Sequence, residues 1–376
     1  MNFDFSDEQA MLRDQARRFL ADASSREKVR QWMNADGDPT AELWPQLAEM
    51  GWLGAAIDEA HGGLGLGTLE LCVLAEELGR ALTPVPFFST VCVAAELLGR
   101  CPVSARRDEL LQRIATGAAV ATFAGAEAGE AWPGTFERSL PKTRLHGGKV
   151  SGEKAVVPDL LLATDLLVTV LDADNQPALV WVDATASGVQ RDALESFDRL
   201  RTHGRLQLLD APAETLLTGP ELAALLRTLR DRAAVIAAFE QLGTAESALT
   251  MARDYTLQRY AFGRPLAGNQ AVKHRLADML VKNELARSNA YFGAWAAHVD
   301  SEELPRAAAA ARLSATEALN FAAEESLHLH GGIGYTWEAD CHLFLRRARL
   351  LAVQLGSTAA WSQRLLDASV EPTLAA

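Results

Sequence analysis

Two glycine-containing segments in the C-terminal third of the chain carry side chains suited to binding a phosphate. The first reads RYAFGRPLAGNQ from Arg259 to Gln270 and combines an arginine at a helix end, the aromatic Phe262 and a new helix start. The second reads HLHGGIGYTWE from His328 to Glu338, and its glycines allow a close backbone approach. Arginine can bind phosphate through two parallel hydrogen bonds, and backbone N–H groups at a helix start attract anions. The segments therefore predict an anion site, with a plain helix–helix turn as the alternative for the glycine segment.

The glycine segment lacks the surroundings of a Rossmann loop. It follows a helix expected over 306–327, and no alternation of strands and helices surrounds it. The nearby His328, His330 and His342 have no spaced carboxylates or cysteines to complete a metal site. We therefore expect neither a Rossmann domain nor a metal centre here.

The composition predicts an acidic chain with a large core. Its 376 residues are 49% hydrophobic and carry a net charge of −13. This size predicts two or three domains, and the charge argues against nucleic acid or an anionic membrane surface as a partner. We expect no signal peptide, no membrane span and, because the four cysteines show no CxxC spacing, neither a zinc cluster nor a disulfide framework. A cytoplasmic protein is predicted.

The hydrophobic pattern predicts an α+β chain in three parts: a helical domain at 1–117, a β-domain at 118–215 and a helical bundle at 216–376. Besides a helix capped by Ser6, the first part is expected to hold helices at 40–51, 67–81, 87–99 and 105–117. In the second part, strands are expected at 166–171, 178–184 and 205–210, the first two forming a hairpin. In the third part, one buried helix face is expected to include Leu276, Met279, Leu280, Ala315, Ala318, Leu319 and Ala322.

Four segments resemble the acyl-CoA dehydrogenase family in its own order along the chain. RYAFGRPLAGNQAVKHRLADM is similar to the family's R-x-x-FG-x-P-I-x-x-x-Q signature, and LHGGIGYT is similar to its GG-x-GY/F element. Residues 50–87 resemble its N-terminal domain and residues 146–170 its middle domain. The resemblance covers nearly the whole chain. It implies a helical N-domain, a middle β-barrel-like domain and a C-terminal four-helix bundle.

The resemblance also implies an FAD cofactor shared between two subunits. In this family the flavin ring lies against the β-domain of one chain, and the neighbouring chain holds the pyrophosphate and adenosine. His328 stands where many members have glutamine, and either side chain can donate a hydrogen bond. The positions that match the FAD-tail site are Arg259, Phe262, Gln270, His328, Gly331, Gly332 and Gly334.

The catalytic base implied by the resemblance is missing from its two usual positions. Family members use a glutamate to remove the α-proton of an acyl-CoA thioester, but here Leu355 and Ala233 stand at the matching positions. Of the nearby acids, Glu240 is expected to be bonded within the bundle, and Asp231 faces away from Ala233 around the helix. The catalytic residue is therefore unknown from the sequence.

The β-domain also departs from the family pattern at the flavin ring. The segment 122–130 lacks the Ser-Asp ending of the family's T-E-P-G-A-G-S-D element, and Val156-Val-Pro158 replaces a Trp-x-Thr contact. The half-site for the flavin ring is thus eroded, whereas the half-site for the FAD tail is retained.

Three functions remain open on this basis. The favoured one is a subunit of a heteromeric acyl-CoA dehydrogenase, in a heterotetramer with a homologous partner that holds the flavin ring, the base and a bulky, steroid-like thioester. The second is a self-sufficient homotetramer with Glu240 or Asp231 as a displaced base. The third is a non-enzymatic relic of the fold. An electron-transferring flavoprotein is the family's usual electron acceptor.

Overall fold

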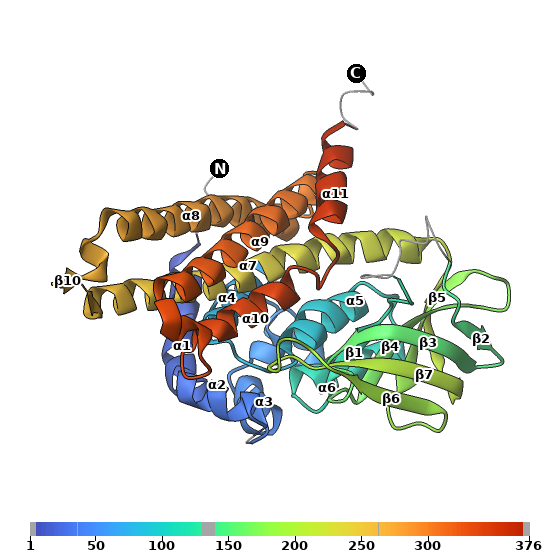
Figure 1. The fold of residues 1–376 in the computed structure, drawn as a ribbon. Helices are drawn as coiled ribbons and strands as arrows, with labels where there is room; N and C mark the ends of the chain where they lie inside the picture. The colour runs from blue at the N-terminus through green and yellow to red at the C-terminus, as the bar shows by residue number, and fades with distance from the viewer. Residues whose placement is uncertain (1–4, 36, 130–139, 262, 371–376) are drawn as a thin grey trace. The chain divides into compact units, whose positions relative to one another are not determined.

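The computed structural model describes residues 5–35, 37–129, 140–261 and 263–370 (Figure 1). The chain forms two compact units, each assembled from segments that are distant in the sequence. The first, here called the helical unit, comprises Met1–Asn34, Thr68–Thr83 and Ala234–Ala376, and the second, the sheet unit, comprises Ala35–Gly67 and Pro84–Ala233. The division into three domains at 117 and 215 stays a prediction.

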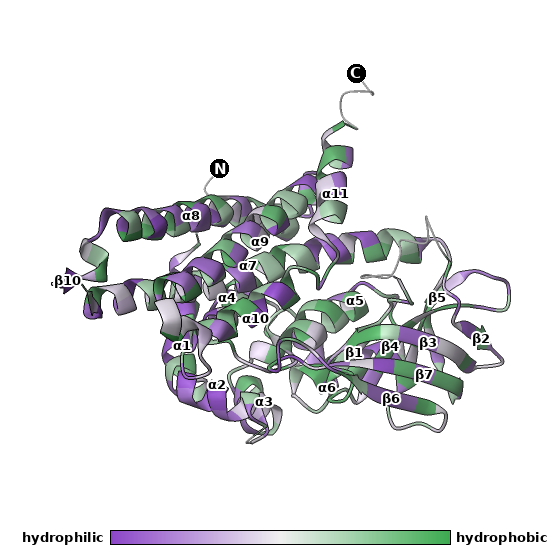
Figure 2. Ribbon diagram, in the orientation of Figure 1, coloured by the Kyte–Doolittle hydropathy of each residue, from purple (hydrophilic) through white to green (hydrophobic). Residues whose placement is uncertain are grey.

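Long helices dominate the helical unit, and α8 and α9 lie side by side in it (Figure 1). Figure 2 shows hydrophobic and hydrophilic residues interleaved along both of these helices, which is the pattern of a helix with one buried face. The elements that contribute to the unit are α1 (Asp7–Ala23), α2 (Arg26–Met33), α4 (Thr68–Ala81), α7 (Glu221–Gln258, from Ala234 on), β9 (Tyr260–Ala261), β10 (Arg264–Pro265), η4 (Leu266–Gly268), α8 (Gln270–His298), α9 (Leu304–Leu329), η5 (Gly331–Tyr335), α10 (Cys341–Leu351) and α11 (Thr358–Val370).

Local signals in the sequence explain where the first helix begins and which face of α9 is buried. Ser6 and Gln9 form a complete capping box, each side chain accepting a hydrogen bond from the other residue's backbone N–H. The predicted face of α9 is confirmed, because Ala315, Ala318, Leu319 and Ala322 are at most 1% exposed. On α8 the prediction was wrong for Leu280, which is 51% exposed although Met279 beside it is buried.

Two glycines allow α4 and α7 to cross with their backbones in contact. A Cβ added at Gly79 would overlap the carbonyl oxygen of Glu240, and one added at Gly243 would overlap that of Glu76. The Thr244 hydroxyl donates to the carbonyl oxygen of Gly79 at 3.0 Å. This close crossing fixes Glu76 of α4 beside the middle of α7.

The sheet unit combines short helices with an eight-stranded sheet of order β6-β7-β3-β2-β4-β5-β8, in which β1 pairs with β4. The predicted hairpin is confirmed, because β4 and β5 pair antiparallel from Asp165↔Asp183 to Leu171↔Pro177. The bounds are α3 (Pro39–Glu49), η1 (Trp52–Gly54), η2 (Glu59–His61), the π-helix η3 (Phe88–Ala95), α5 (Glu96–Gly99), α6 (Ala105–Ala115), β1 (Ala121–Ala124), β2 (Arg144–His146), β3 (Lys149–Pro158), β4 (Asp165–Leu171), β5 (Pro177–Asp183), β6 (Val189–Leu194), β7 (His203–Pro212) and β8 (Glu214–Thr218).

Candidate functional site

The two predicted anion-binding segments lie at the ends of α7 and α9, and a residue of α7 just before the first segment contacts the second. The ring of Tyr255 stacks on the imidazole of His330, with ring centroids 4.2 Å apart and an interplanar angle of 24°. Tyr255 lies one helical turn before Arg259, and His330 directly precedes Gly331. His330 Nδ1–H donates to the carbonyl oxygen of Ser326 at 2.6 Å, which fixes the orientation of the ring. Tyr255 and His330 were not predicted as site residues, and only the position of His330 beside the glycines could have suggested one of them.

Arg259 presents an exposed guanidinium just after the end of α7. Its backbone is fixed, since its N–H donates to Tyr255 and its carbonyl accepts from Leu266, both at 2.8 Å. Within the described ranges no side chain forms an ion pair or hydrogen bond with its guanidinium. Arg259 is therefore available to an anion. Phe262 lies outside the described residues.

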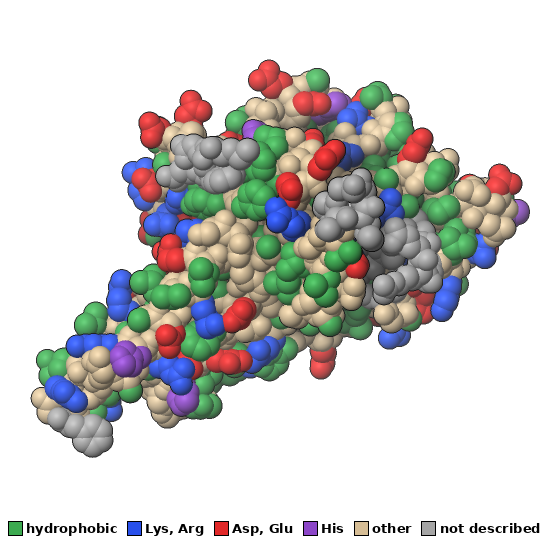
Figure 3. All heavy atoms as spheres, turned by 90° about the horizontal axis from the view of Figure 1, so that it is seen from above, with side chains coloured by type: hydrophobic (Ala, Val, Ile, Leu, Met, Phe, Trp, Pro, Cys, Tyr) green, Lys and Arg blue, Asp and Glu red, His purple; other side chains and the backbone are tan. Residues whose placement is uncertain are grey.

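The surface next to Arg259 is basic. Figure 3 shows basic side chains at the end of the helical unit where β9 and β10 lie. Gln270 begins α8, is exposed, and its amide nitrogen lies 3.1 Å from His274 Nε2. His328 on α9 is exposed as well. The exposed basic residues of this segment are Arg259, Arg264, Lys273, His274 and Arg275.

The three glycines of the loop have different roles. Gly331 has a φ of 63°, and a Cβ added at Gly331 or Gly332 would meet nothing within 4 Å, so the backbone there is open to a ligand. Gly334 is buried, and an added Cβ would overlap the carbonyl oxygen of Leu327. The packing of the chain itself thus requires glycine at 334, while the openness at 331 and 332 suits a bound phosphate.

Helix α2, which was not predicted, anchors the segment that follows the glycines. The guanidinium of Arg30 pairs with the carboxylate of Asp340 and also donates to the carbonyl oxygens of Trp337 and Glu338. One side chain therefore binds three successive parts of the loop between η5 and α10. This contact could not be read from the sequence, because some 300 residues separate its partners.

Both positions matched to the family's catalytic base are buried apolar residues. Leu355 is 2% exposed and Ala233 is fully buried. Glu240 is 3% exposed, and its Oε1 lies 3.2 Å from Nη1 of the fully buried Arg347. The prediction that Glu240 is bonded within the bundle is confirmed. Asp231 is buried too, at 2% exposure.

A second buried arginine depends on the charge of Glu240. Burial lowers the pKa of Arg312 to about 10, and the negative charge of Glu240 opposes that shift. The guanidinium of Arg312 also donates to Gln241 Oε1 at 2.6 Å. Glu240 is thus the counter-ion of a buried charged cluster, and its carboxylate is engaged within the bundle.

In the sheet unit, the two segments that depart from the family pattern at the flavin ring are joined to each other. Thr122 is fully buried, and its hydroxyl donates to the carbonyl oxygen of Pro158 at 2.6 Å. The proton of the Thr122 hydroxyl is therefore already donated to a backbone group of the same chain. Val156, two residues earlier on β3, is 46% exposed and offers only an apolar surface. Glu130, the last residue of the first segment, lies outside the described residues.

Glu127 in the same segment forms a buried polar cluster. Its carboxylate lies 3.0 Å from Lys154 Nζ and accepts hydrogen bonds from the backbone N–H groups of Lys142 and Thr143. Burial alone would raise the pKa of Glu127, but these hydrogen bonds and the charge of Lys154 outweigh it, so the pKa lies below its ordinary value. Glu127 stays ionised and holds the segment together.

The residues of the two half-sites fit FAD unequally. An exposed arginine and an open glycine backbone suit a pyrophosphate, which the end of α7 and η5 supply together. The described part of the segment 122–130, which is matched to the flavin ring, instead supplies a hydroxyl that is hydrogen-bonded to Pro158 and a carboxylate that is paired with Lys154. The fit is therefore good for the FAD tail only.

The described residues form neither a membrane-spanning helix nor a metal-binding cluster. No described helix combines the length and the apolar character needed to cross a membrane. Within the same residues, histidine, cysteine and carboxylate side chains do not gather in a group of three that could hold a metal ion. The four cysteines are buried free thiols.

Comparison with known proteins identifies the family. Residues 6–118 match the acyl-CoA dehydrogenase N-terminal domain, and residues 223–366 match the acyl-CoA dehydrogenase C-terminal domain. The chain is also 32% identical over 343 residues to the acyl-CoA dehydrogenase IpdE2 of Mycobacterium tuberculosis, covering 91% of each protein. The chain belongs to the acyl-CoA dehydrogenase family. The family's members are FAD-binding oxidoreductases, and the resemblance inferred from the motifs is confirmed.

Two solved structures match nearly the whole chain. A variant of the Tcur3481–Tcur3483 steroid ACAD is 34% identical, with a TM-score of 0.85, and the match covers 98% of this chain and 99% of that one. The ChsE4–ChsE5 complex from Mycobacterium tuberculosis is 26% identical, with a TM-score of 0.86 and 99% coverage of both chains. The acyl-CoA dehydrogenase fold, with its helical N-terminal part, mixed sheet and helical C-terminal part, is thus shown.

Proposed function

We propose that this chain is one subunit of a heteromeric, FAD-dependent acyl-CoA dehydrogenase whose homologous partner supplies the catalytic base. The observation that carries the proposal is the pair of buried apolar residues, Leu355 and Ala233, at the positions matched to the family's base. Neither side chain can accept a proton. Glu240 is committed to Arg347, so a carboxylate from another chain has to remove the α-proton of the thioester.

The relatives support a heteromer and a bulky substrate. Both solved structures described above carry the names of two proteins, one described as a steroid ACAD and the other as a complex. We therefore propose a steroid-like CoA thioester as the substrate and an electron-transferring flavoprotein as the electron acceptor. The buried Thr122 hydroxyl in the ring segment agrees with a flavin ring bound by the partner.

The chain's own contribution is to hold the FAD tail. We propose that Arg259 binds the pyrophosphate and that the backbone at Gly331 and Gly332 lies against it. Phe262, Gln270, His328 and Gly334 complete the set of residues proposed for this half-site. Bound FAD supplies a ring that accepts the β-hydride of the thioester. The Tyr255–His330 stack keeps the arginine and the glycines in one fixed arrangement, so that little ordering is needed when the cofactor binds.

Arg259→Ala tests the tail assignment. Loss of a hydrogen bond to a charged group costs about 1.5–3 kcal/mol, so FAD affinity should fall roughly 10- to 150-fold in the assembly that binds it. Arg264→Ala is the matched control, because Arg264 is an exposed neighbour whose guanidinium bonds Asn269. A titration with FAD, monitored by flavin fluorescence, measures the affinity of both variants. Unchanged affinity in Arg259→Ala would reject the assignment.

Flavin content tests the heteromer. The chain is expressed alone and together with a homologous dehydrogenase subunit that retains the glutamate, and bound FAD is counted per polypeptide. The proposal predicts little flavin in the first case and stoichiometric flavin in a mixed oligomer in the second. Stoichiometric flavin in the chain alone would favour a self-sufficient homotetramer, and none in either preparation would favour a non-enzymatic relic.

A further inference from the structure

The loop that carries the FAD-tail glycines has little apolar packing to order it. Apart from the buried Gly334, every residue from 331 to 338 is exposed. The thiol of Cys341 donates to the carbonyl oxygen of Gly334 at 3.3 Å, which ties the middle of the loop to α10. Ordering an exposed backbone costs conformational entropy that burial does not offset, so hydrogen bonds from neighbouring elements have to fix the rest of the loop.

Arg30 of α2 provides such bonds at the end of the loop. Its Nη2 donates to the carbonyl oxygen of Trp337 at 3.0 Å and to that of Glu338, and its Nε donates to the carboxylate of Asp340. A lone ion pair at a surface contributes little to stability. Here, however, one planar guanidinium fixes three groups within residues 337–340, and the loop cannot move away from α2 without breaking all three contacts.

The carboxylate of Asp340 serves this contact instead of its own helix. Asp340 is the N-cap residue of α10, a position where an aspartate usually accepts from the first backbone N–H groups of the helix. Within the described part of the chain its side chain makes no such bond to α10, and it pairs with Arg30. The geometry thus gives up a helix cap in favour of the contact with α2.

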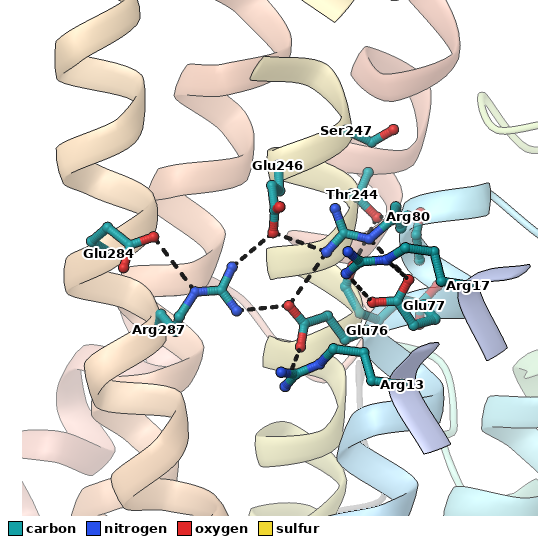
Figure 4. Close-up of polar contacts among 12 residues, drawn as sticks. Arg13, Arg17, Glu76, Glu77, Arg80, Thr244, Glu246, Ser247, Glu284 and Arg287 are labelled. Atoms are coloured by element: carbon teal, nitrogen blue, oxygen red, sulfur yellow. Dashed lines mark hydrogen bonds and ion pairs between the residues drawn. The ribbon is translucent and has the colours of Figure 1, made fainter. Parts of the chain in front are cut away.

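Arg26, the other arginine of α2, fastens this helix to the crossing of α4 and α7. Its Nη2 donates to the carbonyl oxygen of Arg80 at 3.0 Å and to Ser247 Oγ at 2.6 Å. The receiving end is itself fixed, because the guanidinium of Arg80 pairs with Glu77 at 3.0 Å and with Glu246 at 2.9 Å (Figure 4). Helix α2 is therefore attached to a rigid part of the helical unit.

The two arginines of α2 match two residues at the start of α10. Arg26 and Arg30 are one helical turn apart, as are Asp340 and Phe344. While Arg30 pairs with Asp340, the guanidinium of Arg26 lies 4.7 Å from the centroid of the Phe344 ring, a distance typical of a cation–π contact. Burial lowers the pKa of Arg26 to about 10, and the negative charge of Asp340 opposes that shift. Both arginines thus act on the same short stretch directly after the loop.

We propose that Arg30 is a positioning residue for FAD, which holds the loop so that the open backbone at Gly331 and Gly332 keeps the arrangement that receives the pyrophosphate. The inference rests on the proposed function of the chain and extends it to a helix outside the motif segments. Arg30 acts through the loop backbone, without contact with the cofactor. Coupling between two sites is reciprocal, so FAD bound at the glycines stabilises the contact between the loop and α2 in return.

Arg30→Met tests the proposal in the mixed oligomer formed with a glutamate-bearing partner subunit. If the loop is ordered in only a fraction of the chains, the apparent Kd for FAD rises by the inverse of that fraction, and we expect a rise of at least about fivefold. Arg30→Lys keeps the charge but lacks the planar fork, so it should recover only part of the loss, and it serves as the test if Arg30→Met does not fold. Lys28→Met removes the same charge from the same helix and is the matched control, because Lys28 Nζ bonds the carbonyl oxygen of Ala23. Its Kd for FAD should be unchanged, and an equal rise in Lys28→Met and Arg30→Met overturns the proposal.

Amide hydrogen exchange separates positioning from a purely structural role. In the unchanged chain, FAD should slow exchange in Arg26–Met33 as well as in the loop, whereas in Arg30→Met it should slow exchange in the loop alone. Loss of urea stability in Arg30→Met with an unchanged Kd for FAD, or no effect of FAD on exchange in α2 of the unchanged chain, overturns the proposal. FAD binding that is lost in Arg259→Ala but kept in Arg30→Met overturns this inference alone, and absence of FAD binding in every assembly overturns the proposed function with it.

Discussion

Replacing Glu240 by glutamine separates a structural role for this acid from a catalytic one. Its carboxylate lies 3.2 Å from a guanidinium nitrogen of Arg347, and the side chains are 4% and 0% exposed. At this separation, the Coulomb attraction is about 5 kcal/mol with an effective dielectric constant of about 20. Loss of one partner of such a pair leaves an uncompensated buried charge, which typically costs about 3–5 kcal/mol. Arg312, whose pKa of about 10 already reflects its burial, loses the same counter-charge.

We therefore expect Glu240→Gln to lower the free energy of unfolding by about 3–5 kcal/mol, which is a large part of the roughly 5–15 kcal/mol of a typical domain. Equilibrium urea unfolding, followed by tryptophan fluorescence, measures the change. The double variant E240L/R347M replaces the pair by apolar side chains and should recover most of the loss. A change below about 1 kcal/mol in Glu240→Gln, combined with loss of flavin reduction, would refute the structural role and support a displaced base.

Two further predictions concern helix packing and thiol reactivity. Gly243→Ala should destabilise the chain by about 1–3 kcal/mol or more in the same urea assay, because the new methyl group overlaps the carbonyl oxygen of Glu76. The control is Gly99→Ala, whose methyl group meets no neighbour and should change stability by less than about 1 kcal/mol. Equal losses in the two variants would contradict the close helix crossing. All four cysteines are buried, and burial raises the pKa of Cys101 to about 11, so the thiolate forms only at strongly alkaline pH. Ellman's reagent should therefore react slowly with the folded chain. The reaction rate should not show the increase between about pH 7 and 9 that an exposed thiol with a pKa near 8.5 shows. A fast reaction with the native chain would contradict this prediction.

The elements that the sequence predicts best are those with a local cause. The α1 start follows from the Ser6 capping box, and the β4–β5 hairpin follows from two apolar runs around a polar turn. β4 is buried at all seven residues, which explains why five of them are apolar. By contrast, β6 has no buried residue and β2 is three residues long, so neither carries a clear pattern. Their pairing with other strands, rather than their own residues, makes them strands.

In the candidate site, too, only the residues that belong to a local sequence motif could be predicted. Motif residues such as Arg259 and Gly331 could be found because the family fixes their spacing. The contacts that hold them in place, between Tyr255 and His330 and between Arg30 and Asp340, join residues far apart in the chain and leave no local signal. Gly334 cannot be distinguished from the other loop glycines by sequence, because only the structure shows that a Cβ added there would overlap the carbonyl oxygen of Leu327.

The anaerobic reaction of the purified chain with CoA thioesters tests the central claim most directly. The chain, alone and mixed with a glutamate-bearing partner subunit, is combined with a panel of short, long and steroid-like acyl-CoA thioesters while the flavin absorbance is followed. Because Leu355 and Ala233 cannot remove the α-proton, we predict no bleaching by the chain alone and rapid bleaching in the mixture. Rapid bleaching by the chain alone, abolished by Glu240→Gln, would contradict the proposal that a partner supplies the base.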